Sequence, residues 1–330
     1  MAMDLFPRTI TVPLLSFVIT FLFNYWFIHS KYKWGLDHPN ARSLHEVPIP
    51  RIGGVGLFLG VMTSWLLFSL AIPMMVLIGM SLLIAVSLVD DIRGLSVWFR
   101  LLVHGLVALG CACYLFLSED GFFTAIMFTA AIIWMVNLYN FMDGSDGLAG
   151  GMAVIGFGAY GLIAYLGGYE NYALINFSIA FAALGFLLHN FSPACIFLGD
   201  AGAVPLGFLA IIVGIMGWKD NIWPLWFPCL VFSPFIVDAT VTLMKRVFHG
   251  EKIWQAHRQH YYQRMVQAGL GHRTTALCWY GLMLLIGFSA VWSTQQDSST
   301  QQVILLVWGA IYLILLILFE CIQKFHNNRG

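Results

Sequence analysis

Adjacent and regularly spaced carboxylates are the residues of this sequence that are best suited to chemistry. Asp90 and Asp91 stand side by side in LVDDIRG, at the end of a long apolar run. Two neighbouring carboxylates repel each other unless a cation lies nearby or one of them takes a proton. A simple helix end would more readily carry a lysine, because the helix dipole is negative there. The pair is therefore interpreted as functional.

A second group of polar residues is spaced by three in NLYNFMDGSDGLAGG, over 137–151. On a helical turn, successive pairs with this spacing share a face. The glycines that follow let the backbone approach a ligand closely. Oxygen ligands of this kind suit Mg²⁺, which keeps several waters and takes one or two carboxylates plus phosphate oxygens. The group consists of Asn137, Asn140, Asp143 and Asp146.

A third cluster, HNFSPACIFLGDAGAVPLG at 189–207, contributes Asn190 and Asp200. Gly199 and Gly202 flank the aspartate, which directly precedes another apolar run. The alternative to a functional role for Asp200 is an N-cap, since aspartate is favoured at the start of a helix.

Histidine and arginine gather in two more stretches, DHPNARSLHEVPIPRIGG at 37–54 and EKIWQAHRQHYYQRMVQAGLGHR at 251–273. Charged donors of this kind bind phosphate oxygens strongly. A positively charged loop and a basic helix on the membrane surface are the respective alternatives. The second stretch is predicted to be helical, so that two of its histidines share a face. The residues concerned are His38, Arg42, His45, Arg51, His257, Arg258, His260 and Arg264.

Membrane helices must position these clusters, because the 330-residue chain is 60% hydrophobic and only 10% charged. In soluble domains, roughly a quarter of the residues are charged. Apolar runs long enough to cross a bilayer, about 20 residues each, recur throughout the chain, and within a bilayer such runs must be helical. The sequence thus predicts an all-α polytopic membrane protein with a single domain over 1–330 and about eleven spans. They are 9–28, 53–72, 74–89, 98–117, 122–139, 152–168, 172–190, 203–218, 222–244, 276–294 and 302–322.

The distribution of lysine and arginine predicts the orientation of these spans. If the loop 29–52 is cytoplasmic and the spans alternate, 14 of the 16 basic residues fall on the cytoplasmic side, all but Arg8 and Lys219. The N-terminus is then outside and the C-terminus inside. The five polar clusters also fall on the cytoplasmic side, in the predicted loops 29–52, 90–97, 137–151, 190–202 and 245–275. Carboxylates for a metal, with histidine and arginine, are the parts that phosphoryl transfer needs.

These clusters resemble, in order along the chain, the motifs of the polyprenyl-phosphate N-acetylhexosamine-1-phosphate transferases, which are glycosyltransferases of the family 4 type. The resemblance runs from residue 37 to 264 and covers most of the chain. The HRxHxYQR form at 257–264 looks most like the branch that initiates O-antigen or capsule-type glycans. It departs from the triple-histidine form of phospho-MurNAc-pentapeptide transferase. Eleven spans with the C-terminus inside also fit that branch better than the ten-span peptidoglycan enzyme.

The resemblance implies that a sugar-1-phosphate passes from a UDP-N-acetylhexosamine to undecaprenyl phosphate and that UMP leaves. This phosphotransferase reaction would be the first membrane step of O-antigen or related cell-envelope polysaccharide synthesis. Mg²⁺ is the implied cofactor, with Mn²⁺ as an alternative. Direct attack and covalent double displacement both stay open. So does the sugar, because no motif discriminates among the N-acetylhexosamines.

Carried over residue by residue, Asp90 or Asp91 deprotonates or orients the lipid phosphate, and these two residues with Asp200 are the predicted catalytic group. Asp200 is the expected main magnesium ligand, with Asp143 and Asp91 as further ligands. Asp238 is expected to be a buried structural carboxylate. The predicted substrate-binding residues are Arg51, Arg100, Asn137, Asn140, Asp143, Asp146, Asn190, His257, Arg258 and His260.

The expected location is the bacterial inner membrane, with the active site facing the cytoplasm and membrane lipid around the helices. The family also allows a homodimer. The net charge of zero gives no reason to expect a nucleic-acid partner. Two other functions are alternatives. A membrane prenyltransferase that uses magnesium pyrophosphate would need two aspartate-rich helices, of which only 137–146 comes close. A non-enzymatic transporter would more typically show an internal repeat and charges at mid-membrane.

Overall fold

The computed structural model of the protein describes residues 7–31, 35–37, 48–252 and 257–327. Three of the predicted phosphate-binding residues, His38, Arg42 and His45, lie outside the described residues. The fold is helical, as predicted. The helices are α1 (Arg8–His29), α2 (Gly53–Leu67), α3 (Met74–Arg93), α4 (Val97–Phe116), α5 (Gly121–Phe141), α6 (Leu148–Leu166), α7 (Glu170–Asn190), α8 (Asp200–Lys219), α9 (Trp226–Val231), α10 (Ser233–Phe248), α11 (Tyr261–Met265), α12 (Gly271–Ser293) and α13 (Ser298–Asn327).

Nine helices in the described part of the chain are long and apolar enough to cross a membrane, namely α1, α3 to α8, α12 together with the short α11, and α13. Each matches a predicted span. The chain is therefore a multi-pass membrane protein, while the count of eleven spans and the orientation stay predictions. Of the other two predicted spans, 53–72 is the shorter α2, whose 15 residues reach about 22 Å, less than a hydrocarbon core of about 30 Å.

The predicted span 222–244 is not one helix but two, α9 and α10, which meet at Phe232. Pro234 stands in the first turn of α10, where a proline is tolerated because that turn has no backbone partner for its N–H. A proline inside a continuous helix would remove a backbone hydrogen bond and clash with the preceding turn, which favours the break. Hydrophobicity alone registers an unbroken apolar run here, so the break was not predicted.

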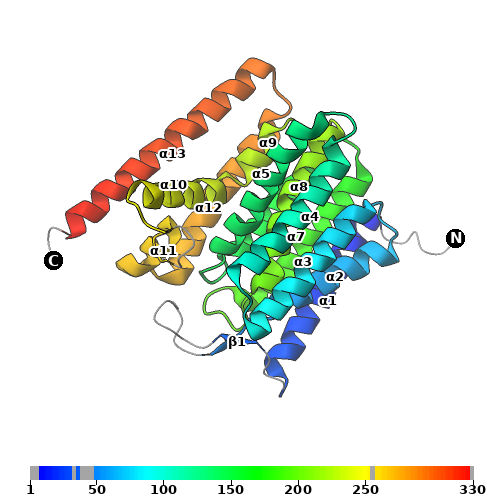
Figure 1. Ribbon diagram of the computed structural model, residues 1–330, viewed down its shortest axis with the longest axis horizontal. Helices are drawn as coiled ribbons and strands as arrows, with labels where there is room; N and C mark the ends of the chain where they lie inside the picture. The colour runs from blue at the N-terminus through cyan, green and yellow to red at the C-terminus, as the bar shows by residue number, and fades with distance from the viewer. Residues whose placement is uncertain (1–6, 32–34, 38–47, 253–256, 328–330) are drawn as a thin grey trace.

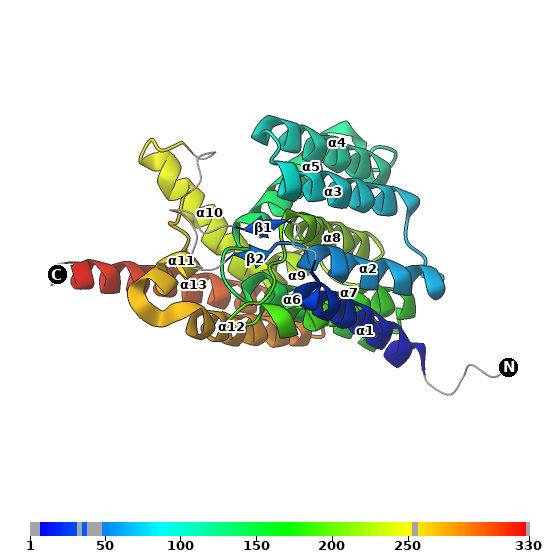
Figure 2. The same ribbon diagram turned by 90° about the horizontal axis from the view of Figure 1, so that it is seen from below.

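Helices α1 to α8 form the bundle, with α8 at its centre (Figures 1 and 2). Helix α8 packs against α3 and α5 and more lightly against α2, and α1 and α6 pack against α7. Backbones approach closely where α2 meets α8, because a Cβ on Gly54 would collide with the backbone of Gly202. Small residues permit such contacts between membrane helices.

A two-residue antiparallel pair, β1 (Leu36–Asp37) and β2 (Ile49–Pro50), closes one end of the bundle. The chain before α8 continues this pairing, since the Phe197 N–H donates to the Pro50 carbonyl at 2.7 Å. The Gly53 and Gly54 N–H groups return bonds to the carbonyls of Phe197 and Leu198. The start of α2 and the start of α8 are thereby fixed beside each other.

Helix α13 lies apart from the bundle and runs beside α12 towards α10 and α11 (Figure 1). It buries almost none of its membrane-length segment. Its exposed side chains are large and apolar, among them Leu306, Leu313 and Ile322. In a bilayer this surface faces lipid, which favours apolar side chains as the protein interior does.

Candidate active site

The described parts of the polar clusters meet at one end of the bundle, where β2, α11 and the ends of α3, α5 and α7 come together (Figures 1 and 2). Hydrogen bonds between segments distant in sequence hold this end. The Tyr262 hydroxyl donates to the Phe141 carbonyl at 2.9 Å, and the Ala194 N–H donates to Asp146 at 3.1 Å. The predicted gathering of the loops on one face of the protein is therefore what the fold produces.

Arg100 bridges two of the predicted catalytic carboxylates. Its Nη1 atom lies 2.7 Å from Asp90 Oδ2 and 3.0 Å from Asp200 Oδ2. Asp90 is on the last turns of α3, Arg100 is on the first turn of α4, and Asp200 opens α8. The three side chains are largely shielded from solvent, and an arginine between two shielded carboxylates offsets repulsion that water would otherwise screen. Asp90 is fixed further by the Leu95 N–H at 2.5 Å.

Asp91 has a different partner from Asp90, although the two are adjacent in sequence. Its Oδ1 and Oδ2 atoms accept hydrogen bonds from the N–H groups of Asp200 and Ala201, at 3.1 and 3.0 Å. These are the first N–H groups of α8, which lack partners within their own helix. Asp91 thus caps α8 from another helix. The N-cap interpretation of Asp200 does not describe the structure, because residue 199 holds the cap position and Asp200 starts the helix itself.

Gly199 is the residue that lets Arg51 and Asp91 lie against the start of α8. Its φ of +73° is left-handed, a region that glycine enters without strain. A Cβ at this position would collide with the Arg51 carbonyl oxygen and lie 2.8 Å from Asp91 Oδ2. The glycine therefore brings the backbone that carries Arg51 into the carboxylate cluster.

Asp143 lies in the turn between α5 and α6, within electrostatic range of Asp91, Asp200 and Arg51. Burial raises the pKa of the Asp143 carboxyl well above its ordinary value, and the negative charges of Asp200 and Asp91 act in the same direction, while Arg51 opposes them. The structure therefore brings the three predicted metal ligands, Asp91, Asp143 and Asp200, into one neighbourhood.

The predicted helical spacing of the second cluster holds only in its first half. Helix α5 ends at Phe141, so Asn137 and Asn140 lie on its last turns, whereas Asp143 and Asp146 lie in the following turn. The expected sharing of a helical face by successive residues can therefore apply to Asn137 and Asn140 and is wrong for the pairs that include Asp143 or Asp146. Glycines end the helix here, because they favour turns over helix interiors. Asn137 donates to the Ile133 carbonyl at 2.7 Å.

Asp146 and Asn190 are engaged with backbone groups at the edge of the cluster. Asp146 accepts from the Ala194 N–H, and Asn190 accepts from the Gly147 N–H at 2.9 Å and donates to the Ile196 carbonyl at 2.8 Å. Both residues, predicted to bind substrate, tie the turn before α6 to the chain before α8. Asn190 is buried, so the contacts that the structure shows for it are structural.

His260 is buried and belongs to a network around Asp238, as expected for a structural carboxylate. The Asp238 side chain accepts bonds from the Tyr261 and Tyr262 N–H groups at 3.0 and 3.1 Å, and from Thr242 at 3.1 Å. Its Oδ1 atom lies 3.1 Å from His260 Nδ1. The carboxylate fixes the orientation of the His260 ring.

His257 lies next to His260, with ring centroids 4.8 Å apart, so the predicted neighbourhood of the two histidines is confirmed. The predicted continuous helix is not, because residues 257–259 are non-helical and α11 starts only at Tyr261. Arg258 lines a cavity between α10 and α13, described below. Arg264 pairs with Glu320 of α13.

No functional role was predicted for two histidines of this region, His104 and His272. His104 is buried one turn after Arg100 on α4, and its ring lies beside Asn137 and within electrostatic range of Asp90. Its spacing of four from Arg100 is the signal that could have identified it. His272, at the start of α12, accepts the Asp146 N–H through Nδ1 at 3.3 Å and lies 2.9 Å from the Ser145 hydroxyl.

The carboxylates of this cluster are ligands of a type that Mg²⁺ accepts. Among the described residues, no group of three or more His, Cys, Asp or Glu side chains is close enough to hold an ion alone. Mg²⁺ usually takes one or two carboxylates and completes its shell with water and substrate phosphate. Asp200 and Asp143 could supply these carboxylates. Asp91 keeps a second lone pair on each oxygen besides those used for the cap.

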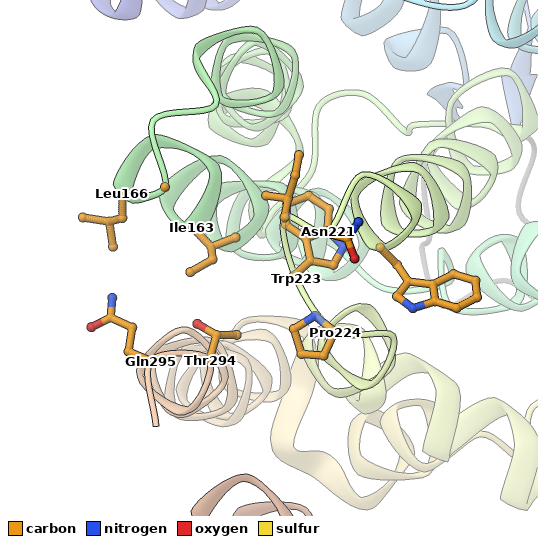
Figure 3. A pocket seen from close by; sticks show the side chains of 10 residues that line it. Ile163, Leu166, Asn221, Trp223, Pro224, Thr294 and Gln295 are labelled. Carbon is orange, nitrogen blue, oxygen red and sulfur yellow. The ribbon is translucent and has the colours of Figure 1, made fainter. Parts of the chain in front are cut away.

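A cavity of about 490 Å³ lies at the opposite end of the bundle, where α6, α8 and α12 finish (Figure 3). Thr294 and Gln295 face Ile163 and Leu166 across it. Its lining contains no ionisable side chain and none of the predicted site residues. Phosphoryl transfer needs charged groups, so this cavity is not the active site.

Comparison with known proteins identifies relatives along most of the chain. The family described as glycosyl transferase family 4 matches residues 73–218, which run from α3 to α8. An undecaprenyl-phosphate alpha-N-acetylglucosaminyl 1-phosphate transferase of Yersinia pestis is 29% identical over 287 residues, which cover 78% of each chain. A probable undecaprenyl-phosphate N-acetylglucosaminyl 1-phosphate transferase of Bacillus subtilis (strain 168) is 27% identical, over 78% of this chain and 76% of the relative.

A decaprenyl-phosphate N-acetylglucosaminephosphotransferase of Mycobacterium tuberculosis (strain ATCC 25618 / H37Rv) is 28% identical over 79% of this chain and 77% of that protein. The matched family segment contains Asp90, Asp91, Asp143 and Asp200, the carboxylates that the fold brings together. The matched segment and these relatives support a polyprenyl-phosphate hexosamine-1-phosphate transferase family for the chain, and the protein is a transferase enzyme.

Proposed function

We propose that the protein transfers N-acetylhexosamine-1-phosphate from a UDP-sugar to undecaprenyl phosphate and releases UMP. The observation that carries the proposal is the Arg100 bridge between Asp90 and Asp200, which joins three helices at the end of the bundle where the polar loops meet. The names of the relatives support the same reaction with N-acetylglucosamine as the sugar. Neither the prenyltransferase nor the transporter alternative is supported by these relatives.

The reaction forms a bond between a lipid phosphate oxygen and the β-phosphorus of the UDP-sugar, while the bond from that phosphorus to the oxygen bridging to UMP breaks. Arg100 and Asp90 form a side-chain ion pair that can open and exchange partners with substrate. In this proposal Arg100 moves from Asp90 to the lipid phosphate, and Asp90 accepts or orients its proton. Asp91 holds the start of α8 and thereby fixes Asp200.

Asp200 and Asp143, with Asp91 behind them, would hold Mg²⁺. When bound, the metal neutralises the pyrophosphate and stabilises the charge that develops on the leaving UMP. The positive side chains supply the rest of the phosphate binding. Arg51 reaches the carboxylate cluster, and His257 lies beside the buried His260. Arginine and histidine donors bind phosphate oxygens more strongly than neutral donors do.

The site is proposed to face the cytoplasm of a bacterial inner membrane, because the cytosol supplies UDP-sugars and the basic residues predict this orientation. The product would open the synthesis of O-antigen or a related cell-envelope polysaccharide. The HRxHxYQR stretch at 257–264 supports that branch.

The test is an assay of purified protein with undecaprenyl phosphate, Mg²⁺ and a panel of UDP-sugars, in which UMP release is measured. We expect UMP release with UDP-N-acetylglucosamine and its loss when the metal is chelated and not replaced. We also expect Asp90→Asn, Asp143→Asn and Asp200→Asn to abolish UMP release in protein that remains folded. No turnover with any UDP-sugar by the folded wild-type protein would refute the assignment.

A further inference from the structure

A second cavity, of about 780 Å³, lies between α10, α11 and the end of α13 (Figures 1 and 2 show these three helices together). None of the residues that line it belongs to the carboxylate cluster of Asp90, Asp91, Asp143 and Asp200. The charged residues of its lining are Lys245, Arg246, Glu251, Arg258, Arg264 and Glu320.

The cavity has an excess of positive charge. Four of its lining side chains are cationic and two are carboxylates, so two positive charges are in excess before His249 is considered. Glu320 shows how the excess arises. Arg264 pairs with both of its oxygens, at 2.7 and 2.9 Å, and Lys245 adds a third contact at 2.6 Å. One carboxylate therefore serves two cations.

Lys245 is the cation best placed to meet a ligand, because 43% of its side chain is exposed. His249, which directly follows the last residue of α10, is also exposed. By contrast, Arg246 is 5% exposed and pairs with Glu251 at 2.9 Å. The accessible part of the charge is thus an ammonium group with a histidine beside it, which together can receive a phosphate group.

The walls of the cavity are those of a membrane boundary. Glu320 lies near the end of the apolar segment of α13 that is long enough to span a bilayer. Ile322 and Leu270 line the cavity and are 67% and 45% exposed. Phe248, next to His249 on α10, is 80% exposed. A ligand with a phosphate and long apolar chains could place both parts here at once.

We propose that this cavity binds the headgroup phosphate of an anionic phospholipid, whose acyl chains lie along the exposed apolar surfaces of α10 and α13. Basic pockets between membrane helices at the cytoplasmic boundary are suited to such headgroups. The site lies outside the carboxylate cluster, although it shares Arg258 with the predicted substrate-binding residues, and the proposal rests on the proposed cytoplasmic orientation of this end of the protein. The bound lipid would fill the space between α13 and the rest of the protein.

The experiment is native mass spectrometry of the purified full-length protein with phosphatidylglycerol or phosphatidylcholine. Wild-type protein is expected to retain phosphatidylglycerol in preference to phosphatidylcholine. Lys245→Gln should weaken phosphatidylglycerol binding about fivefold, the effect of one basic residue near a membrane surface. Glu320→Gln should strengthen it, because Lys245 and Arg264 then lose the competing carboxylate. Arg93→Gln removes an exposed charge elsewhere and should change nothing.

The opposite effects at residues 245 and 320 separate ligand binding from a structural role. Both substitutions break the same ion pair, so a merely structural pair would shift lipid retention in the same direction in both variants. If Lys245→Gln does not fold, His249→Glu places a negative charge at an exposed lining position and should weaken binding in its stead.

Three results would overturn the proposal. The first is equal retention of the two phospholipids, which would mean that no headgroup is recognised. The second is a loss in Arg93→Gln as large as in Lys245→Gln, which would indicate diffuse charge attraction. The third is displacement of phosphatidylglycerol by equimolar glycerol phosphate or undecaprenyl phosphate, which would identify a soluble phosphate or the proposed substrate as the ligand.

Discussion

Asp91 caps the helix that begins with Asp200: its two carboxylate oxygens accept the first two N–H groups of α8, at 3.1 and 3.0 Å. These hydrogen bonds hold together two acidic residues that are 109 positions apart in the chain. The arrangement keeps a second negative charge beside Asp200 and holds it through the backbone. It assigns different roles to the adjacent residues Asp90 and Asp91, since Asp90 faces the side chain of Arg100 instead.

Substitutions at these two positions should therefore differ in their effects. Asp91→Asn keeps one acceptor oxygen and turns an NH₂ group towards a backbone donor, so it should cost about 1 kcal/mol of stability, as losing a helix cap does. It should also lower UMP release by displacing Asp200. Asp200→Asn should abolish UMP release in protein that remains folded, because it weakens the ion pair with Arg100 and at the same time relieves repulsion from Asp91. Thermal unfolding in detergent and UMP assays provide the comparison, and an Asp91→Asn variant of unaltered stability would show that the cap is dispensable.

Arg100 and Asp90 should act as one unit. Arg100→Gln leaves Asp90 and Asp200 without their shared cation, and we expect UMP release to fall by about 100-fold or more, as for other charged groups that stabilise a transition state. In thermal unfolding, the double variant Asp90→Asn/Arg100→Gln should be little less stable than Asp90→Asn alone, since the effects of contacting residues are not additive. Arg93→Gln, at an exposed arginine of α3, is the control. Fully additive losses of stability would mean that Asp90 and Arg100 do not act as one unit.

Gly199 should tolerate no side chain. Gly199→Ala would place a Cβ against the Arg51 carbonyl at a left-handed φ, so it should displace Arg51 or α8 and strongly reduce UMP release. The matched control is Gly250→Ala, whose φ is +71° but whose Cβ would meet open space. The control should lose about 1 kcal/mol of stability from backbone strain alone and keep its activity. Equal activities of the two variants would contradict the importance of this close approach.

Substitutions at Asp238 and His257 should have different effects: the first should lower stability, and the second should lower activity. Asp238→Asn leaves buried donors of Tyr261, Tyr262 and Thr242 without their carboxylate, and we expect a loss of about 2–4 kcal/mol of stability. His257→Gln, at a partly exposed position, should reduce UMP release and leave thermal unfolding unchanged. An unfolding midpoint that falls as far in His257→Gln as in Asp238→Asn would assign both residues to the structural network.

The proposed orientation predicts the outcome of reporter fusions at two exposed turns. A fusion at Gly250 should report the cytoplasm, and a fusion at Asn221, at the opposite end of α8, should report the other side of the membrane. A cytoplasmic enzyme and a periplasmic enzyme fused in parallel provide the two readouts. A Gly250 fusion on the periplasmic side would place the carboxylate cluster away from cytosolic UDP-sugars.

The sequence by itself determined the class of the protein and the group of carboxylates that the fold brings together. Runs of about 20 apolar residues predict membrane helices because the thickness of the bilayer fixes their length, whatever they pack against. The predicted segments for α3 to α8 therefore agree with the structure. Asp90, Asp91, Asp143 and Asp200 also lie together as expected, since they stand at helix ends that must emerge on the same face.

Only the tertiary structure decided the roles within that group. Arg100 bridges Asp90 to a residue 100 positions away, and no local pattern encodes such a contact. The ends of helices are equally non-local. The spacing of the second cluster is compatible with a helix beyond Phe141. The chain turns there instead, because glycines follow and because Asp146 and Asn190 bond to distant backbone groups. The hydrophobic effect has no direction and specifies which residues enter the membrane. Hydrogen bonds and ion pairs need specific geometry, and only the packed helices supply it.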